Sequence, residues 1–333
     1  MKVEGGMKMQ DNLERGRFYF LLPTFAFLLY CASASGAQYP DRPVRVIVGF
    51  AAGGFADSVA RVIGQKLSEQ TGQSFVIDNR GGAGGTIAAK TTAAAAPDGY
   101  TLLVHTAASG INATLAPDPG FDLVKDLAPI ANTISAPGLW IVQSSHPATT
   151  LQDLIRMSKG KRLNYATAGV GTSSHIAGDY LLRSLAGLDA VHVPFRGGAP
   201  ALAALLGGQV DLMSGSGGAL PFIKQGRLKV LGISSLKRSP LYPDAPTVSE
   251  AGFPGFEERS WVGFFAPAKT PAAIVTRLNK EINVALAQAD VKARFEGQGM
   301  ELHPGSVADF TRHVRNEVAM WAKIIKTTGV KAE

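Results

Sequence analysis

Four glycine-rich turns carry the residues best suited to chemistry in this sequence, and each turn follows an expected strand. They span residues 51–57, 81–85, 105–112 and 168–175. A helix start presents backbone N–H groups without intrahelical partners and a partial positive charge, so it binds anions without a Lys or Arg side chain. Glycine lets the backbone approach a ligand, and Ser and Thr hydroxyls add donors. The expected chemistry is therefore recognition of a small anion.

Several residues of these turns are also suited to purely structural roles. Asp57 can cap the helix after the first turn, and the hydroxyls of residues 172–174 can cap the helix after the fourth. Arg196 follows another expected strand, where it is either a surface cation or a lid over the ligand. The candidate ligand-binding residues from these loops are Ala52, Gly53, Gly54, Phe55, Asp57, Thr106, Gly171, Thr172, Ser173, His175 and Arg196.

The common catalytic motifs do not occur in the sequence. We find no G-x-S-x-G, no H-E-x-x-H and no phosphate-binding P-loop, and the six His residues lack metal-ligand spacing. The Gly169–Thr172 turn is a poor dinucleotide site, because Ser174 replaces the third glycine. We therefore expect no catalytic residue, no cofactor and no metal. The alternative is an exported lyase or hydrolase that uses His175 with Thr172 or Ser173.

Short apolar runs alternate with helical periodicity from residue 44 onward, which predicts βαβ units and mostly parallel sheets in an α/β protein. Residues 107–138 are irregular, and two long helices at the end should pack on the first unit. The expected strands are 44–50, 75–78, 101–106, 139–143, 163–168, 190–195, 210–214, 228–233 and 261–267. The expected helices are 57–70, 86–95, 151–159, 175–186, 199–206, 220–225, 272–288 and 307–327.

Residues 1–37 have the features of a secretory signal peptide. Four basic residues flank the start of an apolar run, which is too short to span a bilayer, and small residues at Ser35 and Ala37 favour cleavage before Gln38. Met7 and Met9 are alternative starts to Met1. Cleavage would also remove Cys31, the only cysteine, so no disulfide framework is expected. The predicted location is the periplasm.

The positive charge of the chain does not point to a nucleic acid. Removal of residues 1–37 lowers the net charge from +7 to +6 over 296 residues, and the remaining basic residues are scattered. Nucleic-acid binding requires basic residues gathered on one face or along one helix. We therefore expect no nucleic-acid partner.

The chain resembles the Bug family of periplasmic solute-binding receptors, which serve tripartite tricarboxylate transporters. Each motif is weak alone, but together they occur in the family's order over nearly the whole expected mature chain. The motifs are YPDRPVRVIVGF at 39–50, AGGFAD at 52–57, DNRGGAGG at 78–85, APDGYTLL at 96–103, AGVGTSSHIAG at 168–178, VHVPFRGGAPA at 191–201, LLGGQVDLM at 205–213 and PDAPTVSEAGFPG at 243–255.

The resemblance implies a type II periplasmic binding fold, in which two hinged α/β domains close over a small carboxylate. Domain 1 would comprise residues 38–138 and 256–333, and domain 2 residues 139–255. The implied ligand contacts include Ala107 beside Thr106. The implied partners are a mono-, di- or tricarboxylate and the membrane subunits of the transporter, with a sensor kinase as an alternative, and we expect a monomer.

Two departures from the family pattern bear on the ligand. Phe55 stands where a small residue or proline is common, so it is expected to narrow the pocket or stack on an aromatic acid. Residues 214–218 are SGSGG in place of the usual Phe-Asp segment, which removes an acidic contact for amines. We therefore do not expect an amino-acid receptor.

Overall fold

The computed structural model describes residues 39–115, 120–216 and 218–328. By its internal contacts the chain divides into residues 1–41 and 42–333, and all the strands and helices named below belong to the second part. The expected signal peptide, its cleavage site and Cys31 lie outside the described residues.

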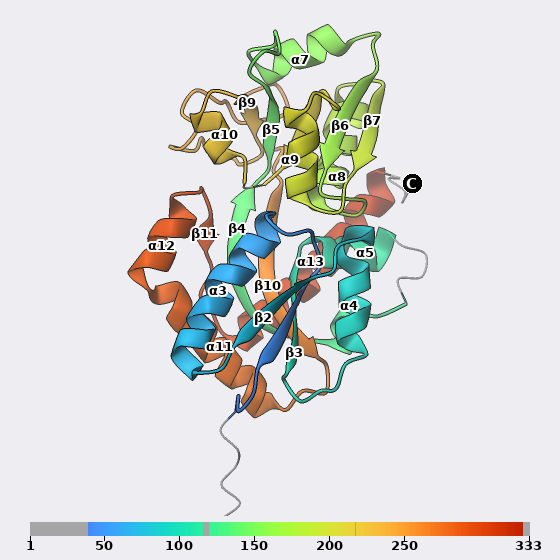
Figure 1. The fold of residues 1–333 in the computed structure, drawn as a ribbon. Coiled ribbons are helices and arrows are strands. Elements are labelled where there is room, and N and C mark those ends of the chain that lie inside the picture. Colours follow the sequence, from blue (N-terminus) through green and yellow to red (C-terminus); the bar gives the residue numbers. More distant parts are fainter. Residues whose placement is uncertain (1–38, 116–119, 217, 329–333) are drawn as a thin grey trace, which may run out of the picture. The chain divides into compact units, whose positions relative to one another are not determined.

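The first of the two sheets of the fold is a mixed sheet of six strands, drawn from both the early and the late part of the chain (Figure 1). Its strand order is β11-β4-β10-β3-β1-β2. The three strands β1, β2 and β3 run parallel, whereas β10 is antiparallel to both β3 and β4. The bounds are β1 (Val44–Val48), β2 (Phe75–Asn79), β3 (Thr101–Thr106), β4 (Leu127–Pro137), β10 (Arg259–Pro267) and β11 (Glu301–Leu302).

Helices cover both faces of this first sheet. One face carries α3 against β1 and β2, with α11 beside α3; the opposite face packs Ile47, Leu103 and Phe265 against α4 and α13. The expected docking of the C-terminal helices on the first unit is confirmed. The helices are α3 (Phe55–Thr71), α4 (Thr86–Ala93), α5 (Ala108–Leu115), α6 (Leu123–Asp126), α11 (Ala272–Ala287), α12 (Ala289–Glu296) and α13 (Val307–Thr328), with a 3-10 turn η1 (Ala83–Gly85).

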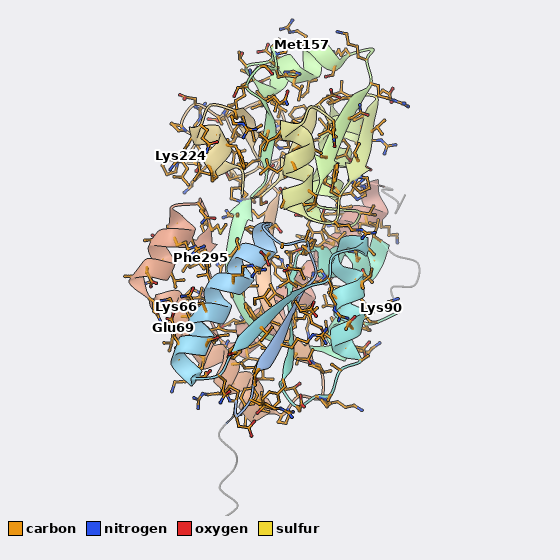
Figure 2. The ribbon with its side chains drawn as sticks, viewed as in Figure 1. Lys66, Glu69, Lys90, Met157, Lys224 and Phe295 are labelled. Carbon is orange, nitrogen blue, oxygen red and sulfur yellow. The ribbon has the colours of Figure 1, made fainter. Side chains whose placement is uncertain are left out.

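Polar side chains on the helices add links between the elements around the first sheet. Lys66 of α3 pairs with Glu69 at 3.3 Å (Figure 2). It also pairs with Asp290 of α12 at 2.8 Å. On α13, Glu317 accepts hydrogen bonds from the indole N–H groups of Trp261 and Trp321, at 3.0 and 2.9 Å. The C-terminal helix is thereby attached to β10.

A second, five-stranded sheet has the order β7-β6-β8-β5-β9. Here β6 is parallel to β7 and β8, and β5 is antiparallel to β8 and β9. The strands are β5 (Leu139–Gln143), β6 (Leu163–Thr167), β7 (Ala190–Pro194), β8 (Leu212–Gly215) and β9 (Leu228–Ile233). The helices are α7 (Leu151–Ser158), α8 (Ser173–Gly178), the π-helical η2 (Asp179–Leu185), α9 (Gly198–Leu206) and α10 (Leu220–Lys224).

The chain crosses between the two sheets at two adjacent points. The first crossing is Gly138, between β4 and β5, and the second is Glu258, before β10. The Gly138 N–H donates to the Glu258 carbonyl at 3.1 Å, and the Glu258 N–H donates to the Ser234 carbonyl at 2.9 Å. Backbone hydrogen bonds thus hold the two crossings side by side.

The expectation of mostly parallel sheets was wrong for part of each sheet. The strands β5 and β10 run against neighbours because the chain enters each of them from the other sheet, not through a βαβ connection. Strand β4 is antiparallel to β10 as a result. The segment 107–138, which the sequence left irregular, contains α5, α6 and β4. Pro129 and Thr133 interrupt the apolar pattern of β4, and the Thr133 hydroxyl donates to the Val262 carbonyl at 2.7 Å.

Among the described helices, none combines the length and the apolar character needed to cross a membrane.

Candidate functional site

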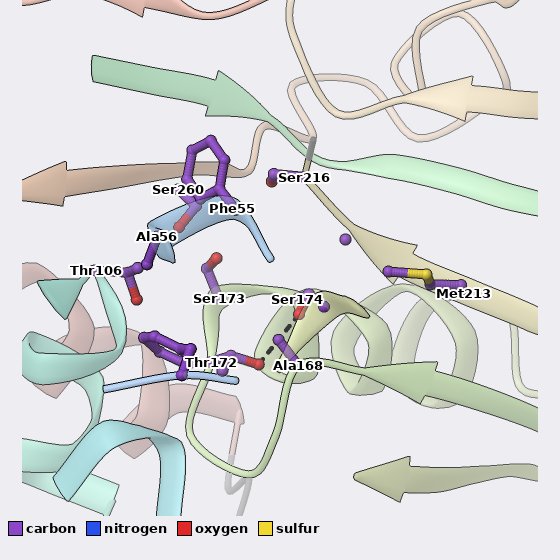
Figure 3. A pocket seen from close by; sticks show the side chains of 13 residues that line it. Phe55, Ala56, Thr106, Ala168, Thr172, Ser173, Ser174, Met213, Ser216 and Ser260 are labelled. Carbon is purple, nitrogen blue, oxygen red and sulfur yellow. Dashed lines mark hydrogen bonds between the residues drawn. The ribbon is translucent and has the colours of Figure 1, made fainter. Parts of the chain in front are cut away.

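A pocket lies at the carboxyl ends of the parallel strands of both sheets (Figure 3). In α/β folds ligands bind outside these strand ends. The pocket holds about 480 Å³ of free space, its open mouth included. Its thirteen lining residues are Phe50, Phe55, Ala56, Thr106, Ala168, Thr172, Ser173, Ser174, Gly198, Met213, Gly215, Ser216 and Ser260.

The first-sheet wall of the pocket is the turn between β1 and α3. Helix α3 begins at Phe55, and its N-cap residue, Gly54, has no side chain to accept from the first N–H groups. These N–H groups are therefore oriented as anion donors beside the pocket residues Phe55 and Ala56. The turn also contacts the second sheet, because the Ala51 N–H donates to the Arg196 carbonyl at 2.8 Å.

Asp57 holds this turn in place instead of lining the pocket. The residue is 2% exposed, and its carboxylate accepts hydrogen bonds from the Gly53 N–H, Arg61 and Asn79, at 2.8, 2.9 and 2.8 Å. It lies inside the first helical turn and reaches back to Gly53, so it is not the N-cap itself. Burial acts to raise the pKa of Asp57, but the three hydrogen bonds and the Arg61 charge lower it overall.

Replacing Asp57 with alanine should lower the free energy of unfolding by about 2 kcal/mol, because three donors lose a charged acceptor. Urea unfolding at pH 7 measures the loss. Asp244→Ala is the control, since Asp244 is exposed, and it should change stability by less than about 0.5 kcal/mol. The two variants should converge as the pH falls from the ordinary Asp pKa through the lowered pKa of Asp57, because protonation then removes the charged acceptor from the folded wild type. Equal losses in both variants at pH 7 would contradict this role.

The second-sheet wall is the turn between β6 and α8. Thr172 is the N-cap of α8: its hydroxyl donates to the Gly169 carbonyl at 2.7 Å and accepts from the His175 N–H at 3.3 Å. The Ser174 hydroxyl lies 3.1 Å from that of Thr172. Ser173 projects into the space near Thr106 and Ser260 (Figure 3). This wall therefore presents hydroxyl groups held by the loop's own hydrogen bonds.

The side chain of His175 contacts this loop from its buried side. Its side chain is fully buried, its Nδ1 accepts from the Gly171 N–H at 3.2 Å, and its ring stacks on His192 at 4.0 Å between centroids. His192 in turn stacks on Tyr165, and burial first, then the charges of His175 and Arg183, lower the pKa of His192 to about 3. His175 is not among the lining residues. Its surroundings give no support to the alternative of a catalytic base.

A side chain of α5, the helix that follows β3 of the first sheet, also contacts the β6–α8 loop. Asn112 of α5 donates from its amide nitrogen to the Ala108 carbonyl at 2.9 Å and to the Gly171 carbonyl at 3.3 Å. A Cβ on Gly171 would overlap the Asn112 side chain, so the two loops fit only with glycine at this position. Helix α5, on the side of the first sheet, is thus in direct contact with the β6–α8 loop of the second.

The structure gathers only part of the predicted residue set at the pocket. The predicted residues that line it are Phe55, Thr106, Thr172 and Ser173. Gly53, Gly54 and Phe55 line a neighbouring cavity together with Gly198. Ala52 and Arg196 are exposed, and Ala107, Asp57, Gly171 and His175 are buried behind the walls. The binding roles of all these residues stay a prediction.

Nine of the lining residues were not among the predicted contacts, although Ala56, Ala168 and Ser174 lie in the turns that the sequence singled out. Gly215 and Ser216 lie in the SGSGG segment, which the sequence places at the end of a strand of the second unit, but no residue of this segment was among the predicted contacts. Ser260 carries no such signal, because its place depends on β10 returning from the second sheet. The nine are Phe50, Ala56, Ala168, Ser174, Gly198, Met213, Gly215, Ser216 and Ser260.

The pocket combines uncharged donors with apolar walls. None of the thirteen lining residues has an ionisable side chain. Phe50, Phe55 and Met213 supply the apolar surface, and five Ser and Thr hydroxyls come from the loops of both sheets, with a sixth from Ser260. Across residues 39–115, 120–216 and 218–328, no three His, Cys, Asp or Glu side chains are placed to hold a metal ion. The arrangement suits a small ligand that accepts hydrogen bonds.

Comparisons with known proteins agree on one family. A family model described as "Tripartite tricarboxylate transporter family receptor" matches residues 59–330. The structure of the periplasmic binding protein BugD is 34% identical, covers 89% of this chain and 100% of that one, and has a TM-score of 0.85.

Two solved relatives from Rhodopseudomonas palustris contain a ligand. One, with adipate, is 35% identical, covers 88% of this chain and 99% of its own, and has a TM-score of 0.84. The other, MatC with bound malate, is 36% identical, covers 86% of this chain and 100% of its own, and has a TM-score of 0.80. Together with the family match, the shared two-sheet fold shows that this chain belongs to the tripartite tricarboxylate transporter family of receptors.

Proposed function

We propose that this protein is a periplasmic receptor that captures a small carboxylate and delivers it to the membrane subunits of a tripartite tricarboxylate-type transporter. One observation carries the proposal: hydroxyl groups and a helix start from both sheets meet in a pocket without a charged side chain. Such groups solvate a carboxylate by hydrogen bonds alone. The adipate and malate held by two solved relatives support this ligand class.

The two sheets are the centres of two domains in this proposal, with residues 38–138 and 256–333 in one and residues 139–255 in the other. The adjacent crossings at Gly138 and Glu258 would serve as the hinge. Opening at this hinge would separate the pocket walls and let the ligand enter, and closing would exclude water around it. Ligand contacts are proposed from the α3 start, Thr106, and the hydroxyls of residues 172–174.

The composition of the pocket also restricts the ligand. A positively charged amine has no acidic side chain to pair with among the lining residues, so amino acids are poor candidates. Phe50, Phe55 and Met213 favour an acid with an apolar chain or ring. Three or four hydrogen bonds to a charged group, each contributing about 1.5–3 kcal/mol, leave about micromolar affinity after the cost of association.

A thermal-shift screen of mono-, di- and tricarboxylates should find at least one acid that raises Tm by about 5 °C. A ligand at a hundred times its Kd stabilises the folded state by about 2.7 kcal/mol, and each kcal/mol raises the Tm of a protein of this size by about 2 °C. Arginine and lysine are the matched controls and should give no shift. The proposal would be contradicted if no acid in the panel raised Tm, or if only arginine and lysine did.

A further inference from the structure

Glu258 is a buried carboxyl group at the second crossing between the sheets. The residue is 5% exposed, and neither side-chain oxygen has a hydrogen-bond partner of normal length among the described residues. Its carboxyl group packs on Gly138, the residue of the first crossing, so closely that a Cβ on Gly138 would overlap it. A buried polar group without a partner is costly, so its presence here calls for an explanation.

The carboxyl group of Glu258 acts on the pocket through Ser173. Burial raises the pKa of Glu258 to about 7, against the opposing effects of the Ser173 hydroxyl, the Gly138 N–H and the Arg259 charge. Ser173 is 4% exposed and lines the pocket, whereas Glu258 is not a lining residue. Ser173 is thus both a wall residue of the pocket and a neighbour of the Glu258 carboxyl group.

Charged and polar side chains from several elements lie near Glu258. Arg259, on β10, is paired with Glu301 at 2.6 Å. Lys323 of α13, Tyr180 of η2 and Glu257 line another cavity together with Glu258. His175 follows Ser173 on α8 and is buried beside Asp179, with 3.9 Å between His175 Nε2 and Asp179 Oδ2. The crossings contribute Ser234, whose hydroxyl accepts from Trp140 at 3.0 Å.

The Ser173 hydroxyl has a single proton, which it can donate either to the Glu258 carboxylate or to a ligand in the pocket. With Glu258 ionised, that proton is drawn to the buried carboxylate, and the hydroxyl then presents lone pairs to the pocket. With Glu258 protonated, the Ser173 proton is free to be donated to a ligand oxygen. An anionic ligand also repels an ionised carboxylate through a medium of low dielectric. Both effects make a bound carboxylate favour the protonated form.

We propose that Glu258 is a positioning residue that acts through Ser173, and that this receptor takes up a proton at Glu258 when it binds a carboxylate. The inference rests on the proposed function, since it requires an anionic ligand in the pocket. It predicts that binding weakens with rising pH, although the ligand itself stays fully ionised.

Isothermal titration calorimetry of adipate, malate and benzoate tests the coupling. For each acid that binds at pH 8, titrations in two buffers of different ionisation enthalpy should show proton uptake, and Kd should rise from pH 7 to pH 9. If the complex keeps Glu258 protonated over this range, the uptake at pH 8 is about 0.9 proton and Kd rises about 50-fold. Glu258→Gln keeps the shape and cannot ionise, so its Kd should stay flat across this range. Ser173→Ala should weaken binding and reduce the proton uptake.

The outcomes separate the two proposals. Binding without proton uptake, together with parallel pH profiles in the wild type and Glu258→Gln, would overturn the role of Glu258 and leave the receptor function intact. A uniform loss of affinity in Glu258→Gln at every pH also overturns it, because it shows a merely structural residue. Failure of all three acids and of the wider panel to bind would overturn the proposed function itself. Proton uptake is measured on the wild type, so the test does not depend on the variants folding.

Discussion

Replacing Gly171 with alanine is expected to weaken carboxylate binding by about 100-fold while the protein remains folded. Gly171 has φ of 72°, and a Cβ at this position would overlap the Asn112 side chain from the first sheet. The methyl group would therefore force the loops of the two sheets apart in the closed arrangement. A loss of about 2.7 kcal/mol from the closed form corresponds to this change in affinity. Calorimetric titration with the best acid of the screen measures it.

Gly160→Ala provides the matched control for this prediction. Gly160 has the same φ of 72°, but a Cβ there meets nothing within 4 Å. Both variants should lose about 1–2 kcal/mol of stability through backbone strain, and only Gly171→Ala should lose affinity. Adding Asn112→Ala to Gly171→Ala should recover part of the binding, since it removes the atoms that the methyl group meets. Equal affinities of the Gly171 and Gly160 variants would rule out a role for this contact.

Replacing Glu258 with glutamine is expected to raise the free energy of unfolding, relative to the wild type at the same pH, by about 2–3 kcal/mol more at pH 8 than at pH 5. Folding raises the pKa of Glu258 from its ordinary 4.5 to about 7. The stability that the neutral carboxyl group permits is complete below pH 4.5 and is lost as the pH rises through 7, because the buried group must then ionise. A tenfold change in the acid dissociation constant corresponds to about 1.4 kcal/mol. Glutamine has no such penalty.

Denaturant unfolding of both proteins at pH 5 and pH 8 measures this effect as a difference of differences. Other titrating groups, such as His192 with its lowered pKa, cancel because both proteins contain them. Glu257→Gln is the control: Glu257 is exposed and adjacent in sequence, so its variant should follow the wild type at both pH values. A Glu258→Gln curve that also follows the wild type would mean that Glu258 is ionised throughout this range.

The sequence predicted those parts of the site that depend on local chain geometry. The order of strand, glycine-rich turn and helix predicted the β1–α3 and β6–α8 turns, and both form walls of the pocket. The hydroxyls at 172 and 173 were identified for the same reason, since a helix start positions its own first residues. The motifs that indicated the family also follow the chain in order, and the family match covers them from residue 59 onward.

Residues that act across the fold could not be distinguished in the same way. His175 and Asp57 follow glycine-rich turns just as Ser173 and Phe55 do, yet the first two are buried behind the walls and the second two line the pocket. One helical residue turns the side chain by about 100°. Which face meets the pocket depends on how the helix packs on its sheet, and the sequence does not specify that packing by itself.

The sequence by itself determined the class of fold, the turns that bear the site and the family, because these follow from short-range periodicity and from motifs contiguous along the chain. Only the tertiary structure brought Ser260 and Glu258 to the site, since they lie more than eighty residues beyond Ser173 and arrive through the second crossing. It also decided the antiparallel strands and the pairing of Gly171 with Asn112. The physical reason is the same in each case: these contacts join residues distant in sequence, whose approach is fixed by the packing of whole sheets and not by local propensity.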